Sequence, residues 1–403
     1  MHNALIGLTL LAATAAGVTL YPAPDSRAGT PSSSTLTPTL AAPAAATPRS
    51  RPRIEVVFAL DTTGSMGGLI AAAKDKIWSI AASLAQADPA PEIRIGLVAY
   101  RDRGDEYVTR VVDLSSDLDA MYAALMDFRA AGGGDGPEAV NQALADAIDG
   151  ISWSGDDNVY RTVFLVGDAP PHMDYQGERT YPEIVQQAKR RGIVVNAIQC
   201  GSQHDTRAVW QHIAALAQGD YIDVAQDGNA VALTTPYDSE LARLATAMDD
   251  TRLFFGDAAA RERAAQKEAA TTKLHAAAPA VLARRAGFNA SAAGAASFAG
   301  DDELVEAVTS GRVDLAVLEA EALPAPLAAM SAAERAAHVG AQAKKRAELK
   351  ARIATLAAER DAWIEEKLAT TDDDAASLDT RLYDTVRRQA AEVGLRYEAP
   401  ARH

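Results

Sequence analysis

Short apolar runs alternate with segments of helical periodicity over roughly the first two thirds of the chain. The apolar runs, which indicate strands, cover 54–60, 93–100, 108–112, 162–166, 193–199 and 221–224. Helical patterns fall between them at about 66–87, 117–128, 137–148, 181–191, 206–217 and 229–248. This alternation is typical of a mostly parallel sheet with helices on both faces. It predicts a doubly wound α/β domain over residues 53–250.

Beyond residue 250 the composition shifts to Ala, Glu, Arg and Lys without a convincing strand, which predicts an α-helical region over 251–403. Ser331 and Glu334 have the spacing of a capping box. Apolar residues then recur at helical spacings at Leu349, Ile353, Leu356 and Trp363. A long helix is expected. Because the repeat places Arg360 in the apolar seam, a helical hairpin or a docking helix is favoured over a short coiled coil.

The N-terminal 52 residues have no pattern of a folded domain. An apolar stretch at 4–20 follows Met1-His2-Asn3, so residues 1–20 are interpreted as a signal peptide or an N-terminal anchor. Residues 21–52 are rich in Pro, Ser, Thr and Ala, which indicates a flexible linker. We therefore expect an exported protein that is periplasmic, envelope-tethered or secreted.

Composition narrows the classes of function. The chain of 403 residues carries a net charge of -15, from 39 basic and 54 acidic residues, which argues against nucleic-acid binding. Its single cysteine excludes an intrachain disulfide framework and any multi-thiolate zinc site. Because Cys200 lies in an apolar run, we expect it to be buried.

Candidate chemistry begins in the loop after the first predicted strand, with the sequence Asp61-Thr62-Thr63-Gly64-Ser65. In open α/β sheets, ligands bind at the carboxyl ends of strands. One carboxylate and two hydroxyls at alternate positions suit a hard divalent cation, which prefers oxygen ligands. The alternative is that Thr63 or Ser65 caps the following helix.

Two later loops supply carboxylates at the same edge. Residues 132–138 read Gly-Gly-Gly-Asp-Gly-Pro-Glu and contain Asp135, and residues 166–172 contain Asp168 at the end of a predicted strand. Asp135 has an alternative role as the N-cap of a helix beginning at Pro137.

This order of Asp-x-Thr-x-Ser, a Gly-rich loop and a strand ending in Asp resembles the metal-ion-dependent adhesion site of von Willebrand factor A domains. The resemblance covers about half of the chain, and the amino-acid sequences of the loops at 100–105 and 168–172 resemble those of a bacterial branch of that family. It implies metal-site roles for Asp61, Thr63, Ser65 and Asp168. Many relatives have Thr where this chain has Asp135, which is then the substitute ligand.

The resemblance further implies Mg²⁺ or Ca²⁺ and a protein ligand whose acidic side chain completes the metal shell. The rim of the site is expected at His172, Asp174 and Asp102. No Ser-His-Asp or Cys-His pattern stands in a recognisable context, so we expect a non-enzymatic, metal-dependent adhesion or assembly protein of the cell envelope. Two alternatives stay open: a scaffold assembled through the helical region around a structural metal, and a metal-assisted hydrolase.

Overall fold

The computed structural model describes residues 51–134, 136–226, 233–368 and 378–398. All of them lie in one compact unit, Ser50–His403. The predicted signal or anchor segment, nearly all of the predicted linker and Asp135 lie outside the described residues. No helix in the described part of the chain combines the length and apolar character that crossing a membrane requires.

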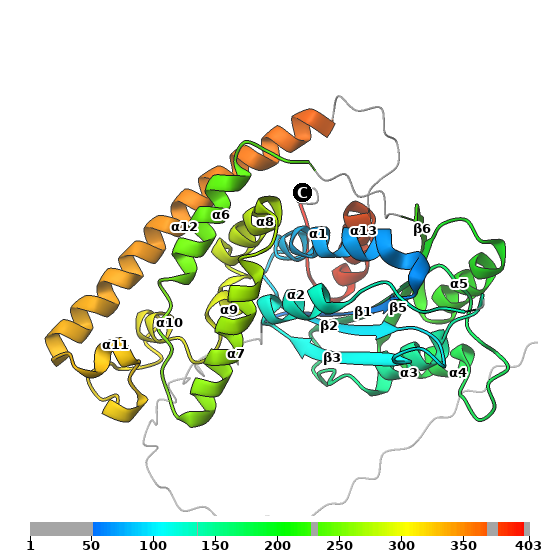
Figure 1. The fold of residues 1–403 in the computed structure, drawn as a ribbon, viewed down its shortest axis with the longest axis horizontal. Coiled ribbons are helices and arrows are strands. Elements are labelled where there is room, and N and C mark those ends of the chain that lie inside the picture. Colours follow the sequence, from blue (N-terminus) through cyan, green and yellow to red (C-terminus); the bar gives the residue numbers. More distant parts are fainter. Residues whose placement is uncertain (1–50, 135, 227–232, 369–377, 399–403) are drawn as a thin grey trace, which may run out of the picture. The chain divides into compact units, whose positions relative to one another are not determined.

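Six strands form one sheet in the order β3-β2-β1-β4-β5-β6. The strands are β1 (Arg53–Asp61), β2 (Glu92–Tyr100), β3 (Thr109–Ser115), β4 (Val159–Gly167), β5 (Ile193–Cys200) and β6 (Gln218–Val224). Only the edge strand β3 runs antiparallel to its neighbour, β2; the other four pairings are parallel. The strand order reverses between β1 and β4, because the chain proceeds from β1 to β2 on one side and returns to β4 on the other (Figure 1).

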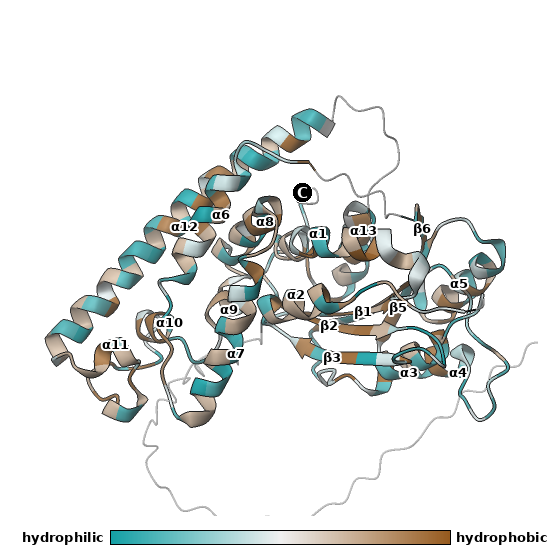
Figure 2. Ribbon diagram, viewed as in Figure 1, coloured by the Kyte–Doolittle hydropathy of each residue, from teal (hydrophilic) through white to brown (hydrophobic). Residues whose placement is uncertain are grey.

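Helices cover both faces of the sheet, and successive strand residues point to opposite faces. Val56 packs in a core with α1 (Gly67–Leu84), α2 (Leu118–Asp127) and α13 (Leu378–Gln389). Val57 packs in the opposite core with α3 (Val140–Asp149), α4 (Tyr181–Arg190) and α5 (His204–Leu216). Figure 2 shows the hydrophobic strands between these layers. The predicted doubly wound α/β fold is confirmed.

Two helix starts differ from the prediction. The helix expected from residue 137 begins at Val140, because Glu138 is held extended in a bridge to Pro171. The helix expected over 229–248 appears as α6 (Asp238–Asp249), and residues 227–232 lie outside the described part.

The region after residue 251 is helical, as predicted. It contains α7 (Ala258–Leu274), α8 (Pro279–Ala290), α9 (Ala295–Ala299), α10 (Leu304–Thr309), α11 (Ala325–Ala328) and α12 (Ala332–Leu368), followed by α13 and the 3₁₀ turn η3 (Ala390–Val393). The capping box before α12 is present: the Ser331 N–H donates to Glu334 Oε2 at 2.8 Å, and the Glu334 N–H faces Ser331 Oγ at 3.4 Å.

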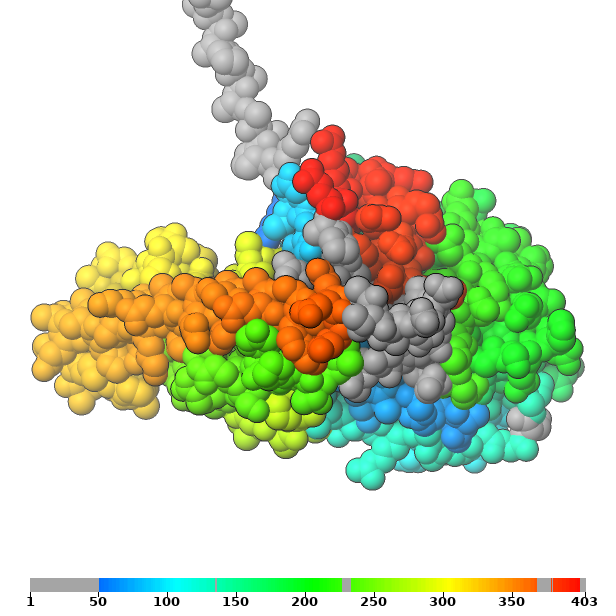
Figure 3. Space-filling view, turned by 90° about the horizontal axis from the view of Figure 1, so that it is seen from above, coloured from blue at the N-terminus to red at the C-terminus, as the bar shows by residue number. Residues whose placement is uncertain are grey.

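The long helix α12 is a docking helix. It lies along α6 and also contacts α8 and α10 (Figure 3). Ile353 and Leu356 share a core with Leu241 of α6. Arg360 fits this seam because its Nε donates to Asp238 Oδ1 at 2.8 Å, so the buried charge has a partner.

The helical region is joined to the sheet domain by buried charges. The Arg285 guanidinium of α8 donates to Asp119 of α2 at 2.6 Å and to Asp249 of α6 at 2.9 Å. All three side chains are at least 95% buried. A triad of this kind stabilises one arrangement of helices, because removal of one member leaves an unpaired buried charge.

The last helix returns to the sheet. Leu382 and Val386 of α13 lie in the same core as Val56 of β1, although more than 300 residues separate them in the sequence. Beside this core, the Gln389 amide nitrogen donates to Asn196 Oδ1 at 2.9 Å and its oxygen accepts from the Tyr160 hydroxyl. One layer of the sheet domain is therefore completed by the C-terminal segment.

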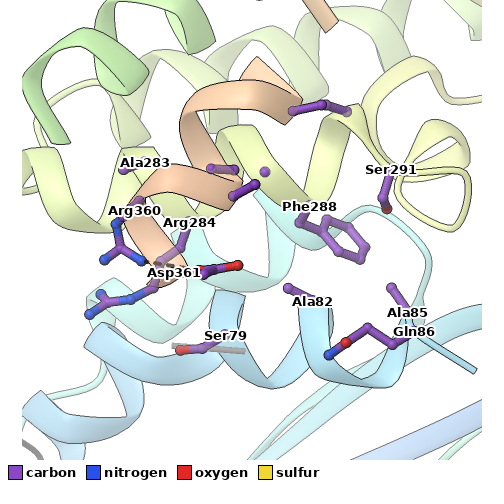
Figure 4. Close-up of a pocket in the computed structure, with 15 residues that line it drawn as sticks. Ser79, Ala82, Ala85, Gln86, Ala283, Arg284, Phe288, Ser291, Arg360 and Asp361 are labelled. Carbon is purple, nitrogen blue, oxygen red and sulfur yellow. Dashed lines mark ion pairs between the residues drawn. The ribbon is translucent and has the colours of Figure 1, made fainter. Parts of the chain in front are cut away.

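A cavity of about 360 Å³ lies between α1, α8 and α12. Seven of its fifteen lining residues are alanines, which are too small to fill the space between three converging helices. Figure 4 shows Arg284, Arg360 and Asp361 at one end and Phe288 near the other. No histidine or cysteine lines it, and none of its lining residues belongs to the loops after β1 and β4.

Candidate metal centre

The candidate site lies at the carboxyl ends of β1 and β4, which are neighbours at the centre of the sheet. Asp61 is the last residue of β1, and Asp168 directly follows β4. This is the point where the strand order reverses, and such points form ligand-binding crevices in open α/β sheets. The topology therefore brings together two carboxylates that are more than 100 residues apart.

The loop after β1 is organised by Asp61. Its Oδ1 accepts the Thr63 N–H at 2.8 Å and the Thr63 hydroxyl at 2.7 Å. The Thr63 and Ser65 hydroxyl oxygens are 3.4 Å apart. Asp61 and Thr63 are buried, whereas Ser65 is exposed. Three oxygen-bearing side chains therefore face one another within five residues.

The helix-capping alternative for these hydroxyls has no support in the described contacts. Thr63 precedes the short 3₁₀ turn η1 (Gly64–Met66), and Met66 precedes α1, but neither position makes a side-chain capping hydrogen bond. Thr62 differs from Thr63, because its hydroxyl donates to the carbonyl oxygen of Tyr100 at 2.8 Å. Of the two threonines, only Thr63 hydrogen-bonds Asp61 through its side chain.

The Gly-rich loop packs directly against this turn. The Gly64 N–H donates to the carbonyl oxygen of Gly132 at 3.1 Å. Gly133 has a φ of 79°, and a Cβ atom there would lie 3.2 Å from Glu138 Oε1 and 3.3 Å from Thr63 Cβ. Glycine is required by both the backbone conformation and the close approach. The loop thus places Glu138 beside Thr63.

Glu138 is the site residue that the sequence analysis did not assign. Its side chain is buried, and Oε2 has no hydrogen-bond partner among the described residues. Burial, together with the nearby charges of Asp61 and Asp102, raises the pKa of Glu138 to about 9. The sequence contains a signal for it, because Glu138 is the second acidic residue of the Gly-rich loop that contains Asp135.

Asp61 has a similar electrostatic problem. Its Oδ2 is buried without a hydrogen-bond partner in the described residues. Burial raises the pKa of Asp61 to about 7, with a further increase from Asp168, although the two hydrogen bonds from Thr63 oppose the shift. Buried carboxylates close to one another are stabilised by a cation.

Asp168 is held from the opposite side by Gln226, which follows β6. The Gln226 amide nitrogen donates to Asp168 Oδ2 at 2.8 Å and to the carbonyl oxygen of Ser65 at 3.1 Å. The main-chain carbonyl of Asp168 accepts the Thr206 hydroxyl at 2.9 Å. Gln226 was not predicted, because nothing in its local sequence marks it.

Asp135 lies outside the described residues, so its predicted role as a metal ligand stays a prediction. The alternative as the cap of a helix beginning at Pro137 is wrong, because α3 begins at Val140 and Ala139 occupies its N-cap position. The Glu138 N–H donates to Pro170 and its carbonyl accepts from His172, which keeps this segment extended.

The three predicted rim residues form a connected group. The Tyr175 hydroxyl is 2.9 and 3.0 Å from the two Asp102 oxygens. His172 Nε2 lies 3.4 Å from Asp102 Oδ2, and His172 Nδ1 lies 3.0 Å from Asp174 Oδ1. Asp102 and His172 are buried, so Asp174 is the member of the predicted rim that is exposed to solvent.

The donor chemistry at this edge fits a hard divalent cation. Among the described residues, no group of three or more His, Cys, Asp and Glu side chains is arranged to hold a metal ion by itself. Hydroxyl oxygens would therefore have to join the carboxylates, and Thr63 and Ser65 supply them. Cys200 is buried as predicted, and burial raises the pKa of its thiol.

Comparison with known families agrees with this architecture. Residues 55–235 match the family model of the von Willebrand factor A domain. The match covers somewhat less than half of the chain and contains the six strands except the first two residues of β1. This segment is a von Willebrand factor A domain.

One curated relative is a putative ariadne-like RING finger protein of Acanthamoeba polyphaga mimivirus, 29% identical over 119 residues. The similarity covers 30% of this chain and 11% of the relative, so the chain spans about a tenth of that protein's length.

Part of the chain is similar to several solved structures at low identity. The von Willebrand factor A domain of SpRpn10 is 14% identical, with a TM-score of 0.35, and 44% of this chain covers 91% of it. Proximal thread matrix protein 1 of the mussel byssus, with a zinc-occupied adhesion-site motif, is 16% identical, with coverage of 44% and 43% and a TM-score of 0.36. The pilus adhesin SpaC of Lactobacillus rhamnosus GG is 16% identical, with coverage of 44% and 28% and a TM-score of 0.34.

Proposed function

We propose that this chain is an exported, non-enzymatic protein that binds a protein partner through a divalent cation held by its von Willebrand factor A domain. The observation that supports this most directly is the pair of buried carboxylate oxygens, Asp61 Oδ2 and Glu138 Oε2, that have no hydrogen-bond partner in the described residues. Leaving buried acidic oxygens unpaired is costly, and a cation at this edge would remove that cost.

The residues proposed to hold the cation are Asp61, Thr63, Ser65, Asp168 and, by its position, Glu138. Asp135 is proposed as a further ligand on the basis of the family resemblance. The cation would be Mg²⁺ or Ca²⁺, since both take oxygen ligands. When bound, it would supply a positive charge, and an acidic side chain of the partner could complete its coordination shell. The residues of this chain would hold that charge at the sheet edge where Ser65 is exposed.

Export to the cell envelope is part of the proposal and depends on the apolar N-terminal stretch and the linker. Both lie almost wholly outside the described residues, so only the sequence supports this part of the proposal. Signal-peptide processing can be tested by determining the N-terminus of the mature protein.

The experiment is capture of partners from an envelope extract by the full chain, in Mg²⁺, in Ca²⁺ and in chelator. We expect captured proteins to be released by chelator and absent with Asp61→Ala. The matched control is Asp205→Ala, at an exposed position outside the site. If capture persists in chelator and with Asp61→Ala, the scaffold alternative, with assembly through the helical region, replaces this proposal.

A further inference from the structure

The cavity between α1, α8 and α12 is large for a gap between packed helices. Its volume is about 360 Å³. Protein interiors leave few voids larger than a water molecule, whereas ligand pockets begin at about 300 Å³. All three helices contribute small residues to its walls, among them Ala82 and Ala85 of α1, Gly287 of α8, and Ala354 and Ala357 of α12. Size alone does not define a ligand, so the polar groups must indicate its chemistry.

The cavity has a buried floor and an open side. Ala283 and Phe288 of α8 line it and are each 1% exposed, which places the floor against that helix. Ala354 and Ala358 of α12 line it as well, and both are exposed to solvent. A small molecule can therefore enter along α12 and reach an aromatic ring. Figure 4 shows this ring at the end of the cavity opposite Arg284.

Arg284 carries an unused donor at the polar end of the cavity. Its Nη1 donates to the carbonyl oxygen of Asp75 at 3.1 Å and to Asp75 Oδ1 at 2.9 Å. Its Nε is buried and has no hydrogen-bond partner among the described residues. The whole side chain is 3% exposed. Because a buried donor without an acceptor is costly, this end favours a ligand that brings an acceptor oxygen to the guanidinium.

The neighbouring charges indicate that this oxygen should be uncharged. Arg360 Nε donates to Asp238 Oδ1 at 2.8 Å, and Arg360 Nη1 lies 4.0 Å from Asp361 Oδ1. Together with Arg284 and Asp75, the polar end holds two positive and three negative charges, a sum of -1. An anionic head group would add to this excess where charges interact strongly. A cationic head group would face Arg284, which accepts no hydrogen bond.

We propose that this cavity binds a small, neutral, mostly apolar molecule, with one carbonyl or hydroxyl oxygen at Arg284 and its apolar body along the alanine walls toward Phe288. The inference is independent of the proposed metal-dependent function, because no lining residue belongs to the loops after β1 and β4. A molecule between α1, α8 and α12 would contact both the sheet domain and the helical region. Its binding would therefore stabilise the packing of one on the other.

The test uses three probes with an octyl-length chain and different head groups: octanamide, octanoate and octylamine. Calorimetry on the full chain in chelator measures each dissociation constant, and thermal unfolding measures the stabilisation. Octanamide should bind at one site and raise the melting temperature. Octanoate and octylamine should bind about tenfold more weakly or worse, since each loses the equivalent of one hydrogen bond to a charged group.

Ala82→Phe tests whether octanamide binds in the cavity. Ala82 is a half-buried residue of the α1 wall, so a phenyl ring there would occupy the space that the apolar body of the probe needs. Octanamide binding should be lost, whereas the ligand-free protein should still unfold cooperatively. Ala71→Phe is the matched control, at an exposed position of the same helix that does not line the cavity, and it should leave binding unchanged.

Arg284→Met tests the polar contact. Methionine keeps most of the apolar stem but has no donor, so octanamide binding should weaken by about tenfold. Arg243→Met is the control, at an arginine of α6 whose side chain is 65% exposed, and it should leave binding unchanged. If Arg284→Met unfolds because Asp75 loses its partner, Ala82→Phe decides the question alone.

Three results would each overturn the inference. The wild type fails to bind octanamide, in which case the cavity holds water only. Octanoate or octylamine binds as tightly as octanamide, in which case the ligand is not neutral. Ala82→Phe leaves octanamide binding unchanged, in which case the probe binds elsewhere. Because all measurements are made in chelator, none of these results bears on the proposed metal-dependent function.

Discussion

Replacing Glu138 by glutamine should stabilise the metal-free protein and at the same time abolish most of the stabilisation by metal. Glutamine has nearly the same shape as glutamate but cannot ionise. Glu138 is buried near Asp61, Asp102, Asp105 and Asp168, and its pKa is raised from 4.5 to about 9. The two opposite effects follow from the same burial and the same neighbouring charges.

The metal-free effect follows from proton linkage. Because the folded pKa lies above the unfolded one, the folded protein keeps a proton that the unfolded chain releases between pH 4.5 and about 9. The stability contributed by this group is fully present below pH 4.5 and falls as the pH rises toward 9. At pH 7 the loss is of the order of 3 kcal/mol, from about 2.5 pH units at 1.36 kcal/mol each.

Metal should stabilise the wild type much more than it stabilises the variant. With cation at a hundredfold excess over Kd, the wild type gains about 2.7 kcal/mol. If the substitution weakens cation binding by about a hundredfold, the same concentration adds only about 0.4 kcal/mol. At roughly 2 °C per kcal/mol, the variant should melt about 6 °C higher in chelator and gain less than about 1 °C from metal, against about 5 °C for the wild type.

Differential scanning calorimetry at pH 5, 7 and 8.5, in chelator and in Mg²⁺, would measure all of these quantities. The advantage of Glu138→Gln in chelator should grow with pH, since only the wild type has a group to deprotonate. A variant that melts lower than the wild type in chelator at pH 8.5 would show that Glu138 acts as an ordinary structural side chain. An unchanged gain from Mg²⁺ would remove Glu138 from the set of proposed metal ligands.

Three further predictions test other parts of the structure. Arg285→Met should cost about 3–5 kcal/mol at pH 7, because two buried carboxylates lose their partner. The deficit should shrink below the unfolded pKa of 3.8: Arg285 holds the pKa of Asp119 well below that value, so the wild type loses this stabilisation only as the pH falls from 3.8 toward the folded pKa. Urea titrations at pH 7 and at about pH 2.5 measure both. Leu382→Asp places a charge in the core under α13 and should lower the melting temperature, and a melting temperature unchanged in calorimetry would mean that α13 does not complete the sheet domain. Thr63→Val should weaken Mg²⁺ binding about tenfold in calorimetry, whereas Thr62→Val, whose hydroxyl bonds to a backbone carbonyl, should not; equal effects would contradict the separate roles of the two hydroxyls.

Much of the fold is determined locally and could be read from the sequence. The run from Ile54 to Leu60 is apolar at nearly every position, as expected for a strand covered on both faces, and it forms the centre of the sheet. The capping box of Ser331 and Glu334 involves residues only three apart, so its pattern was sufficient to predict where α12 begins. Asp61 and Asp168 could be placed at one edge because parallel strands share the direction in which they end.

The remaining features depend on contacts between distant residues, which periodicity does not record. In the sequence, Arg360 interrupts an apolar seam. Its partner Asp238 lies 122 residues away, so the local pattern does not show that the charge is paired. The return of α13 to the sheet depends on Leu382 and Val386 packing in the core that β1 forms with α1 and α2. Neither contact leaves a trace in the local sequence.

The same division applies to the candidate site. Sequence determined that a carboxylate and two hydroxyls follow β1, because their spacing is a property of five adjacent residues. Only the tertiary structure placed Glu138 beside Thr63 and Gln226 beside Asp168, since both contacts depend on how the loops meet once the sheet has formed. The unpaired oxygens of Asp61 and Glu138 also became visible only there, because burial and the loss of water are properties of the packed protein and not of the chain.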